Sequence, residues 1–253
     1  MRYLTIAAIL LSICQPTLAQ YLQHFSGEKF NYQLTVKTLT NAYGLFGVKK
    51  GEAQLSIKTS TDQRINLEAE AIIFNNQKKN DVFLRNSAKI FIEQNKVKHF
   101  EYQFTDSTTH YWLVNNHQHK VYHYNQEGFV DSLVLLYEPR EIITAVLYLM
   151  NNGSIALGKI YSTYFINSDS GGYCHWEELK TVVDKNKEKI KIGDLEIECF
   201  RLTFSFINKI SLGSHYTLGE PVIWLSQVGR PLKIKVVLYW HLLPIAVITG
   251  EYH

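Results

Sequence analysis

The stretch EPREIITAVLYLM, residues 138–150, predicts a helix that divides the chain into two halves. Pro139 suits the first position of a helix, and Glu141 follows in the first turn, where negative charge favours the helix dipole. Asn152 and Gly153 come next and can supply a left-handed exit from the helix. Because apolar residues surround this segment on nearly all sides, we expect the helix to be buried. Several of them are β-branched, which leaves a buried strand as the alternative.

Both halves alternate apolar and polar residues, which is typical of half-exposed antiparallel strands. The clearest case is Arg64 to Ile73, where every second residue is apolar. The polar connections between the segments before the helix are too short for parallel crossovers. The strands expected before the helix are Phe30–Val36, Gly51–Ile57, Arg64–Ile73, Val82–Leu84, Ile90–Glu93, Phe100–Phe104, Tyr111–Val114 and His119–Tyr124. Those expected after it are Lys159–Ile166, Cys174–Val183, Leu195–Phe206, Pro221–Leu225 and Leu232–Trp240.

The first 19 residues have the pattern of a secretory signal. Arg2 precedes an apolar run from Leu4 to Ile13, and small residues stand at Thr17 and Ala19, which predicts cleavage after Ala19. A membrane anchor is the alternative, but the run is far shorter than the ~20 residues that span a bilayer. We therefore expect a signal peptide over residues 1–19 and one β-rich domain over residues 20–253, whose two halves are joined by the helix near 139–150.

The composition supports a soluble β-protein. Tyrosine (16) and phenylalanine (13) are abundant, whereas proline (5) and methionine (2) are scarce, which favours strands with aromatic cross-strand pairs. Removal of Arg2 leaves 25 of the 26 basic residues against 23 acidic ones, a net charge of 25 − 23 = +2. So small a charge gives no reason to expect nucleic acid as a partner.

Several spaced segments resemble domain-of-unknown-function family 3108. They are Gly27-Glu28 with the aromatic strand after it, Gly51-Glu52-Ala53, the apolar helix Glu141 to Leu149, Val222 to Ser226 and Arg230 to Ile234. One departure is Gln227-Val228-Gly229, where the family's pattern has an acidic turn.

The resemblance implies an exported, periplasmic protein of bacteria with no established activity and no inherited catalytic residues. The fold that it implies is mainly β: a curved antiparallel sheet, open half-barrel or sandwich with one buried central helix. Carriers that shuttle lipoproteins to the outer membrane have a similar architecture. Such likeness is a fold-level argument and does not by itself assign a function.

Four histidines lie between residues 110 and 123, and His117 and His119 have the spacing that places two imidazoles on one face of a strand. Zinc binds such pairs. The alternative is that residues 115–118 form the turn between two strands, so that His117 lies at an exposed tip. No further ligand stands at a suitable spacing, and we expect no metal and no cofactor.

Two other patterns suggest enzymes but have ordinary alternatives. Ser170 lies in a segment similar to the nucleophile segment of trypsin-like proteases, but the flanking residues differ and the string is typical of a flexible turn. Glu196 and Glu198 share one strand face, as paired carboxylates of glycosidases do, yet a solvated face has the same pattern. We therefore expect a protein that is not an enzyme.

The aromatic residues Trp176, Trp224, Trp240 and Tyr148 are candidates to line a cavity for an apolar ligand. They are equally candidates for core packing, because aromatic side chains dominate β-cores.

Cys174 and Cys199 are the two cysteines that remain after signal cleavage. If residues 174–184 and 189–199 form one hairpin, residues whose numbers sum to 373 pair, and the two cysteines lie opposite each other within disulfide reach. A bulge at Gly193-Asp194 would turn the thiols to opposite faces. Both a disulfide and two buried thiols remain open.

Two function hypotheses follow. The first is a periplasmic, non-enzymatic protein that binds a hydrophobic or amphipathic, lipid-like ligand in a curved sheet. The second is a structural or interaction module of the cell envelope, with a protein partner at exposed strand edges. A metal-dependent envelope hydrolase is the third possibility.

Overall fold

The computed structural model describes residues 22–38, 49–60, 64–74, 82–94, 96–104, 109–151, 155–168, 173–206, 210–211, 216–240 and 243–253. The expected signal peptide and Ser170 lie outside the described residues. Within them, the strands are β1 (Lys29–Thr38), β2 (Lys49–Thr59), β3 (Arg64–Phe74), β4 (Val82–Glu93), β5 (Lys96–Gln103), β6 (Thr109–Asn115), β7 (Lys120–Asn125), β8 (Gly128–Val134), β9 (Ile160–Ser168), β10 (Cys174–Val183), β11 (Glu188–Ile192), β12 (Leu195–Ser205), β13 (Ile210–Ser211), β14 (Tyr216–Leu218), β15 (Val222–Leu225), β16 (Pro231–Trp240) and β17 (Leu243–Tyr252). Helix α3 spans Ile142–Asn151.

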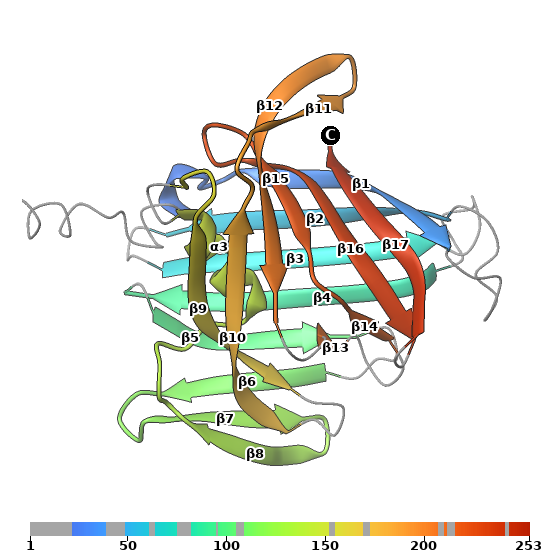
Figure 1. Cartoon of the computed structure of the whole chain (residues 1–253). Helices are drawn as coiled ribbons and strands as arrows, with labels where there is room; N and C mark the ends of the chain where they lie inside the picture. The colour runs from blue at the N-terminus through green and yellow to red at the C-terminus, as the bar shows by residue number, and fades with distance from the viewer. Residues whose placement is uncertain are drawn as a thin grey trace, which may run out of the picture.

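The expected fold class is confirmed: the strands form one large antiparallel sheet that curves but does not close into a barrel. Its paired strands follow the order β8-β7-β6-β5-β4-β3-β2-β1-β17-β16-β15-β12-β10-β9. In Figure 1, β1–β8 form one layer, and β9, β10, β12 and β15–β17 run across it with α3 between the layers. The central pairing joins β1 to β17, so the two ends of the chain hold the two halves together.

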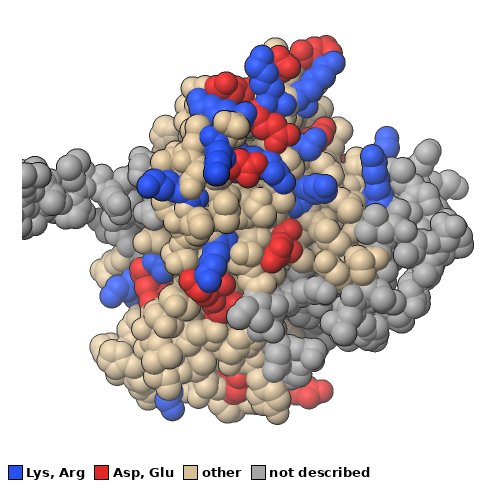
Figure 2. All heavy atoms as spheres, in the orientation of Figure 1, with Lys and Arg blue, Asp and Glu red and all other residues tan. Residues whose placement is uncertain are grey.

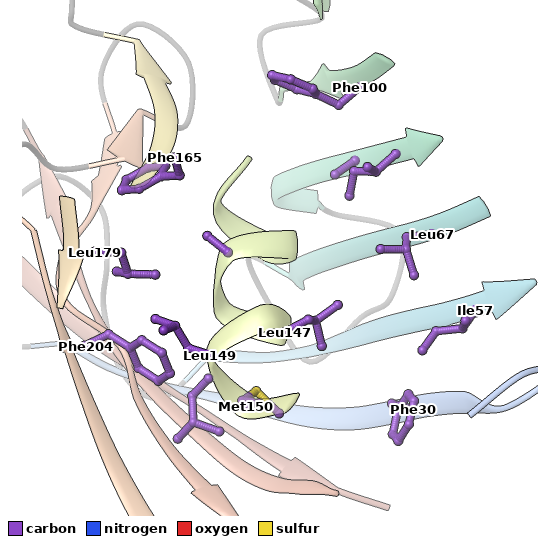
Figure 3. Close-up of a cluster of buried hydrophobic side chains, with 14 of the residues drawn as sticks. Phe30, Ile57, Leu67, Phe100, Leu147, Leu149, Met150, Phe165, Leu179 and Phe204 are labelled. Carbon is purple, nitrogen blue, oxygen red and sulfur yellow. The ribbon is translucent and has the colours of Figure 1, made fainter. Parts of the chain in front are cut away.

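Helix α3 fills the concave side of the sheet, as its apolar sequence predicts. Ala145, Leu147, Leu149 and Met150 are all at most 5% exposed. Figure 3 shows Leu147 facing the side chains of β2 and β3, while Leu149 faces those of β10 and β12. Both layers therefore pack on one helix in a common core. No helix in the described part of the chain is long and apolar enough to cross a bilayer.

Glu141 caps this helix. Its carboxylate accepts hydrogen bonds from the backbone N–H groups of Ile143 (2.8 Å) and Thr144 (2.5 Å), which otherwise have no partner at a helix N-terminus. The residue therefore stands just before the first turn rather than inside it.

The strand predictions differ from the structure in several places. The segments expected at Val82–Leu84 and Ile90–Glu93 are one strand, β4, in which the exposed Arg85 and Lys89 alternate with buried residues such as Ala88. His119 belongs to the turn before β7 and has a positive φ of 51°. Strands β8, β11, β13, β14 and β17 were not among the expected set.

The predicted register of the cysteine hairpin is wrong. The chain reverses at Gly193-Asp194, where Gly193 takes a φ of 57°, and this turn pairs β11 with β12. Cys199 therefore lies opposite Glu188, and Cys174 lies opposite Ser168. Both cysteines are thiols outside any disulfide.

Candidate functional site

A polar network lies on the concave face of β6–β8. His123 is fully buried, and its Nδ1 is 3.1 Å from Oδ1 of Asp131. On the other side of the ring, Nε2 is 2.8 Å from Nδ1 of His110. The strand register explains the contact between His123 and Asp131, because the two residues lie directly opposite each other on β7 and β8.

Trp112 and Cys174 complete this polar network. The Trp112 ring stacks on His123 with centroids 4.6 Å apart and planes 6° apart, and its Nε1–H donates to Cys174 Sγ at 3.0 Å. The backbone N–H of Cys174 donates to Oδ2 of Asp131 at 2.6 Å. Imidazole, carboxylate and thiol groups of His123, Asp131 and Cys174 thus offer ligand atoms that all lie within 4.8 Å of one another. Nitrogen, oxygen and sulfur donors of this kind are the ligands of zinc in proteins.

The helix cap adjoins the network. Tyr102 packs edge-on against Trp112, with centroids 5.7 Å apart, and its hydroxyl donates to the carboxylate of Glu141. Burial raises the pKa of Glu141, although its hydrogen bonds oppose the shift. Burial also raises the pKa of Tyr102 well above its ordinary value, and the nearby Glu141 charge adds to this. Tyr102 is therefore a neutral donor over the whole physiological range.

A second feature is the seam patch, which we define as Val134, Leu136, Tyr137, Tyr164 and Trp176. It lies where β8 and the connection after it meet β9 and β10. The rings of Tyr137 and Tyr164 stack 3.8 Å apart, and Trp176 packs edge-on against Tyr137 at 5.3 Å. The indole N–H of Trp176 donates to the carbonyl of Val134 at 2.8 Å, which joins the two ends of the curved sheet.

The seam patch is apolar and open to solvent. Val134 is 53% exposed, Leu136 68% and Tyr137 42%. Figure 2 shows few charged side chains over β6–β8 in the lower part of the view, whereas Lys, Arg, Asp and Glu gather around the β11–β12 hairpin at the top. Exposed apolar side chains grouped in one part of the surface are candidates for an interaction site.

Of the four aromatic residues proposed from the sequence, the three with described side chains lie in different parts of the structure. Trp176 belongs to the seam patch. Tyr148 lies under the guanidinium of Arg140, 3.9 Å from the ring centroid. Trp224 lies in a separate small cluster at the β11–β12 hairpin, where its Nε1–H donates to Glu188. The side chain of Trp240 is outside the described part of the structure.

One pocket among the described residues is on the outer face of β3–β5 and has a volume of about 130 Å³. Asn66, Glu68, Lys89, Phe91 and His99 are among its lining residues. Sites for drug-sized ligands range from ~300 to 1,000 Å³, so this hollow is too small to enclose an acyl chain.

The histidines that the structure brings together are not the pair with metal-ligand spacing in the sequence. His117 is exposed in the turn over residues 116–119, as the turn interpretation predicts, and His119, which was expected in the next strand, is exposed in the same turn. His110 and His123 contact each other instead, and the nearby Cys174, which accepts a hydrogen bond from Trp112, comes from a strand 51 residues further along the chain than His123. No local spacing joins these residues, because β10 reaches them only after the sheet has curved back.

Glu196 and Glu198, which share one strand face, form ion pairs with lysines at the surface. Glu196 binds Lys189 at 3.3 Å, and Glu198 binds Lys187 at 3.1 Å.

Comparison with known proteins shows the fold alone. No protein-family model matches the chain, and no curated protein matches its sequence. A solved structure with the same architecture is the beta-barrel-like protein of domain of unknown function DUF1849 from Brucella abortus. Its TM-score is 0.59 at 11% identity, and the match covers 89% of this chain and 95% of that one. A porin-like protein from Bacteroides uniformis matches 88% of this chain and 95% of its own at 7% identity, with a TM-score of 0.28.

The chain is thus similar in fold to a β-rich domain of unknown function, which agrees with the general kind of protein that the sequence indicated. The neighbour belongs to family 1849, so the resemblance to family 3108 in particular gains no support from it.

Proposed function

We propose that the mature chain is an exported, non-catalytic protein of the bacterial periplasm that binds an amphipathic, lipid-like ligand at the seam patch. The observation that carries the proposal is the exposed apolar surface at Val134, Leu136 and Tyr137, beside the half-buried Trp176, where the sheet fails to close. The export pattern of residues 1–19 supports the compartment.

The chemistry of the seam patch suits an acyl chain with a polar head. Leu136 and Val134 offer apolar surface, and the tyrosines add flat rings with a hydroxyl at one end. Aromatic side chains with a polar tip are favoured where one end of a site is apolar and the other wet. The proposed site lies at the seam patch and not on the concave side of the sheet, where the ligand was expected from the sequence, because α3 fills that side.

A lysophospholipid with one acyl chain, used below its micelle concentration, tests the proposal. We expect Leu136→Ser to weaken binding, measured by calorimetry or by fluorescence of the adjacent Trp176, because the change removes apolar contact. Leu195→Ser is the matched control, since Leu195 is equally exposed (69%) but lies on the β11–β12 hairpin. Equal binding by both variants, or no binding by the wild-type protein, would contradict the proposal.

The second candidate is an interaction module of the cell envelope, and one observation favours it. Among the described strands, β8 is paired along its length with β7 and has no strand paired on its second edge, where the carbonyl of Val134 accepts from the Trp176 side chain. Unpaired edges are templates for strand addition by a partner. Crosslinking from Ser132 in β8 distinguishes the two: a crosslinked protein with no bound lipid in native mass spectrometry favours the interaction module.

A further inference from the structure

We propose that His123, Asp131 and Cys174 form a binding site for one zinc ion on the concave face of β7, β8 and β10. The proposal is independent of the ligand at the seam patch. It rests on the geometry of three different ligand groups and on the contacts that orient each of them.

The three groups are close enough for zinc after small side-chain adjustments. Zinc bonds are ~2.0–2.1 Å to imidazole nitrogen and ~2.3 Å to thiolate, which places tetrahedral ligand atoms roughly 3.3–3.8 Å apart. Nδ1 of His123 and Oδ1 of Asp131 are 3.1 Å apart, and all three ligand atoms lie within 4.8 Å of one another. Three protein ligands leave the fourth tetrahedral position for water or a further ligand.

Each ligand is held by a contact outside the three. Trp112 stacks on the His123 ring and donates its Nε1–H to the sulfur of Cys174, which favours a thiolate. Asp131 is oriented by the backbone N–H of Cys174 through its other oxygen. His110 meets His123 Nε2 at 2.8 Å. Such outer contacts fix the orientation of metal-binding side chains and raise their affinity.

The protons balance through a change of tautomer. The proposal assigns the metal-free tautomers so that His110 donates from Nδ1 to His123 Nε2 and His123 donates from Nδ1 to Asp131, which fits the two contacts. With zinc on His123 Nδ1, the ring carries its proton on Nε2 and donates to Nδ1 of His110, whose proton moves to its own Nε2. The imidazoles remain neutral, the S–H bond of Cys174 breaks, and one proton enters solvent as the Zn–S bond forms.

Cobalt(II) and zinc titrations of the mature protein test the site. We expect one zinc per chain and, with cobalt, a near-ultraviolet thiolate-to-metal absorption band. Cys174→Ser abolishes the band, whereas Cys199→Ser retains it, because Cys199 lies in the separate hairpin cluster. His110→Ala weakens zinc binding roughly 10–100-fold, as loss of an outer contact does, while His117→Ala at the exposed turn has no effect.

A measurement on the unaltered protein guards against misfolded variants. Zinc slows alkylation of Cys174, mapped by peptide mass, and leaves the rate at Cys199 unchanged. The proposal is overturned if wild-type protein takes up no stoichiometric zinc, if the cobalt complex lacks the thiolate band, or if Cys199→Ser rather than Cys174→Ser removes it.

Discussion

At the scale of single residues, Glu141 both caps α3 and accepts a hydrogen bond from Tyr102. The sequence pattern indicates only the first of these contacts. The position of Glu141 near the helix start is readable, because acidic residues favour that end. Its burial and its bond to Tyr102 are not, since Tyr102 lies 39 residues earlier. The result is a carboxyl group that caps α3 from inside the core at an exposure of 0%.

The raised pKa of Glu141 gives a pH prediction. The folded state holds this proton more tightly than the unfolded chain, so the free energy of unfolding falls as pH rises from the ordinary value of 4.5 through the raised pKa. We expect Glu141→Gln, which keeps an oxygen for the cap, to remove this part of the slope. Chemical denaturation across that pH range measures it.

Glu196→Gln on the exposed hairpin is the control and should keep the wild-type slope. A slope in Glu141→Gln equal to that of the wild-type protein would show that the carboxyl group does not titrate differently on folding.

The two cysteines give a second prediction at this scale. Because their strands place them apart, intact-mass analysis of unreduced, unfolded protein should show two alkylated cysteines. Burial raises the pKa of Cys199, so in the native protein its alkylation should be slow. If neither cysteine were alkylated before reduction, the two would be joined in a disulfide and this prediction would be wrong.

At the scale of elements, the sequence is most informative where a pattern is long and regular. Strand β3 and helix α3 have such patterns, and both are confirmed. Strand β17 was not predicted, because it contains Pro244 and its apolar residues do not alternate with polar ones over most of its length. Strand β11 was not predicted, because it is short and most of its residues are charged. The predicted pairing of Cys174 with Cys199 was wrong because the segment has two possible turns, one at residues 185–188 and one at Gly193-Asp194. The positive φ of Gly193 favours the second turn.

The buried helix predicts a large effect of truncation. Leu147→Ala should lower the free energy of unfolding by ~2–5 kcal/mol, because it leaves a cavity between the helix and the sheet. Leu195→Ala, at an exposed site, should cost far less. Urea denaturation compares the two, and a loss below about 1 kcal/mol for Leu147→Ala would mean that the core can collapse around the gap.

Gly51 predicts that β2 tolerates no side chain at this position. A Cβ there would lie 2.2 Å from the carbonyl oxygen of Ile72 on β3, so the two strands would have to separate. We expect Gly51→Ala to cost roughly 1–3 kcal/mol, as overpacking does. Gly27→Ala is a comparison in which nothing lies within 4 Å, although its positive φ of 80° adds backbone strain.

At the scale of the whole molecule, the sequence predicts the class of fold but not how the ends of the sheet meet. The curved shape followed from a family resemblance, whereas the network and the seam patch depend on where β10 crosses β8. That crossing involves residues such as Trp176 and Val134, which are 42 positions apart. Alternation within a strand has no information on such distant neighbours.

The shared core predicts one cooperative unfolding transition. Side chains from both layers and from α3 belong to one cluster, so neither half has a core of its own. Urea unfolding curves from far-ultraviolet circular dichroism and from tryptophan fluorescence should coincide. Two separated transitions would indicate two domains instead of the single one expected for residues 20–253.

The pairing of β1 with β17 also determines when the sheet can be completed during folding. Tyr32 lies opposite Tyr252, 252 − 32 = 220 positions further along the chain, so β1 cannot gain its second neighbour until β17 is present. Contacts between such distant parts of a chain form slowly. Until β17 joins the sheet, β1 therefore has one open edge.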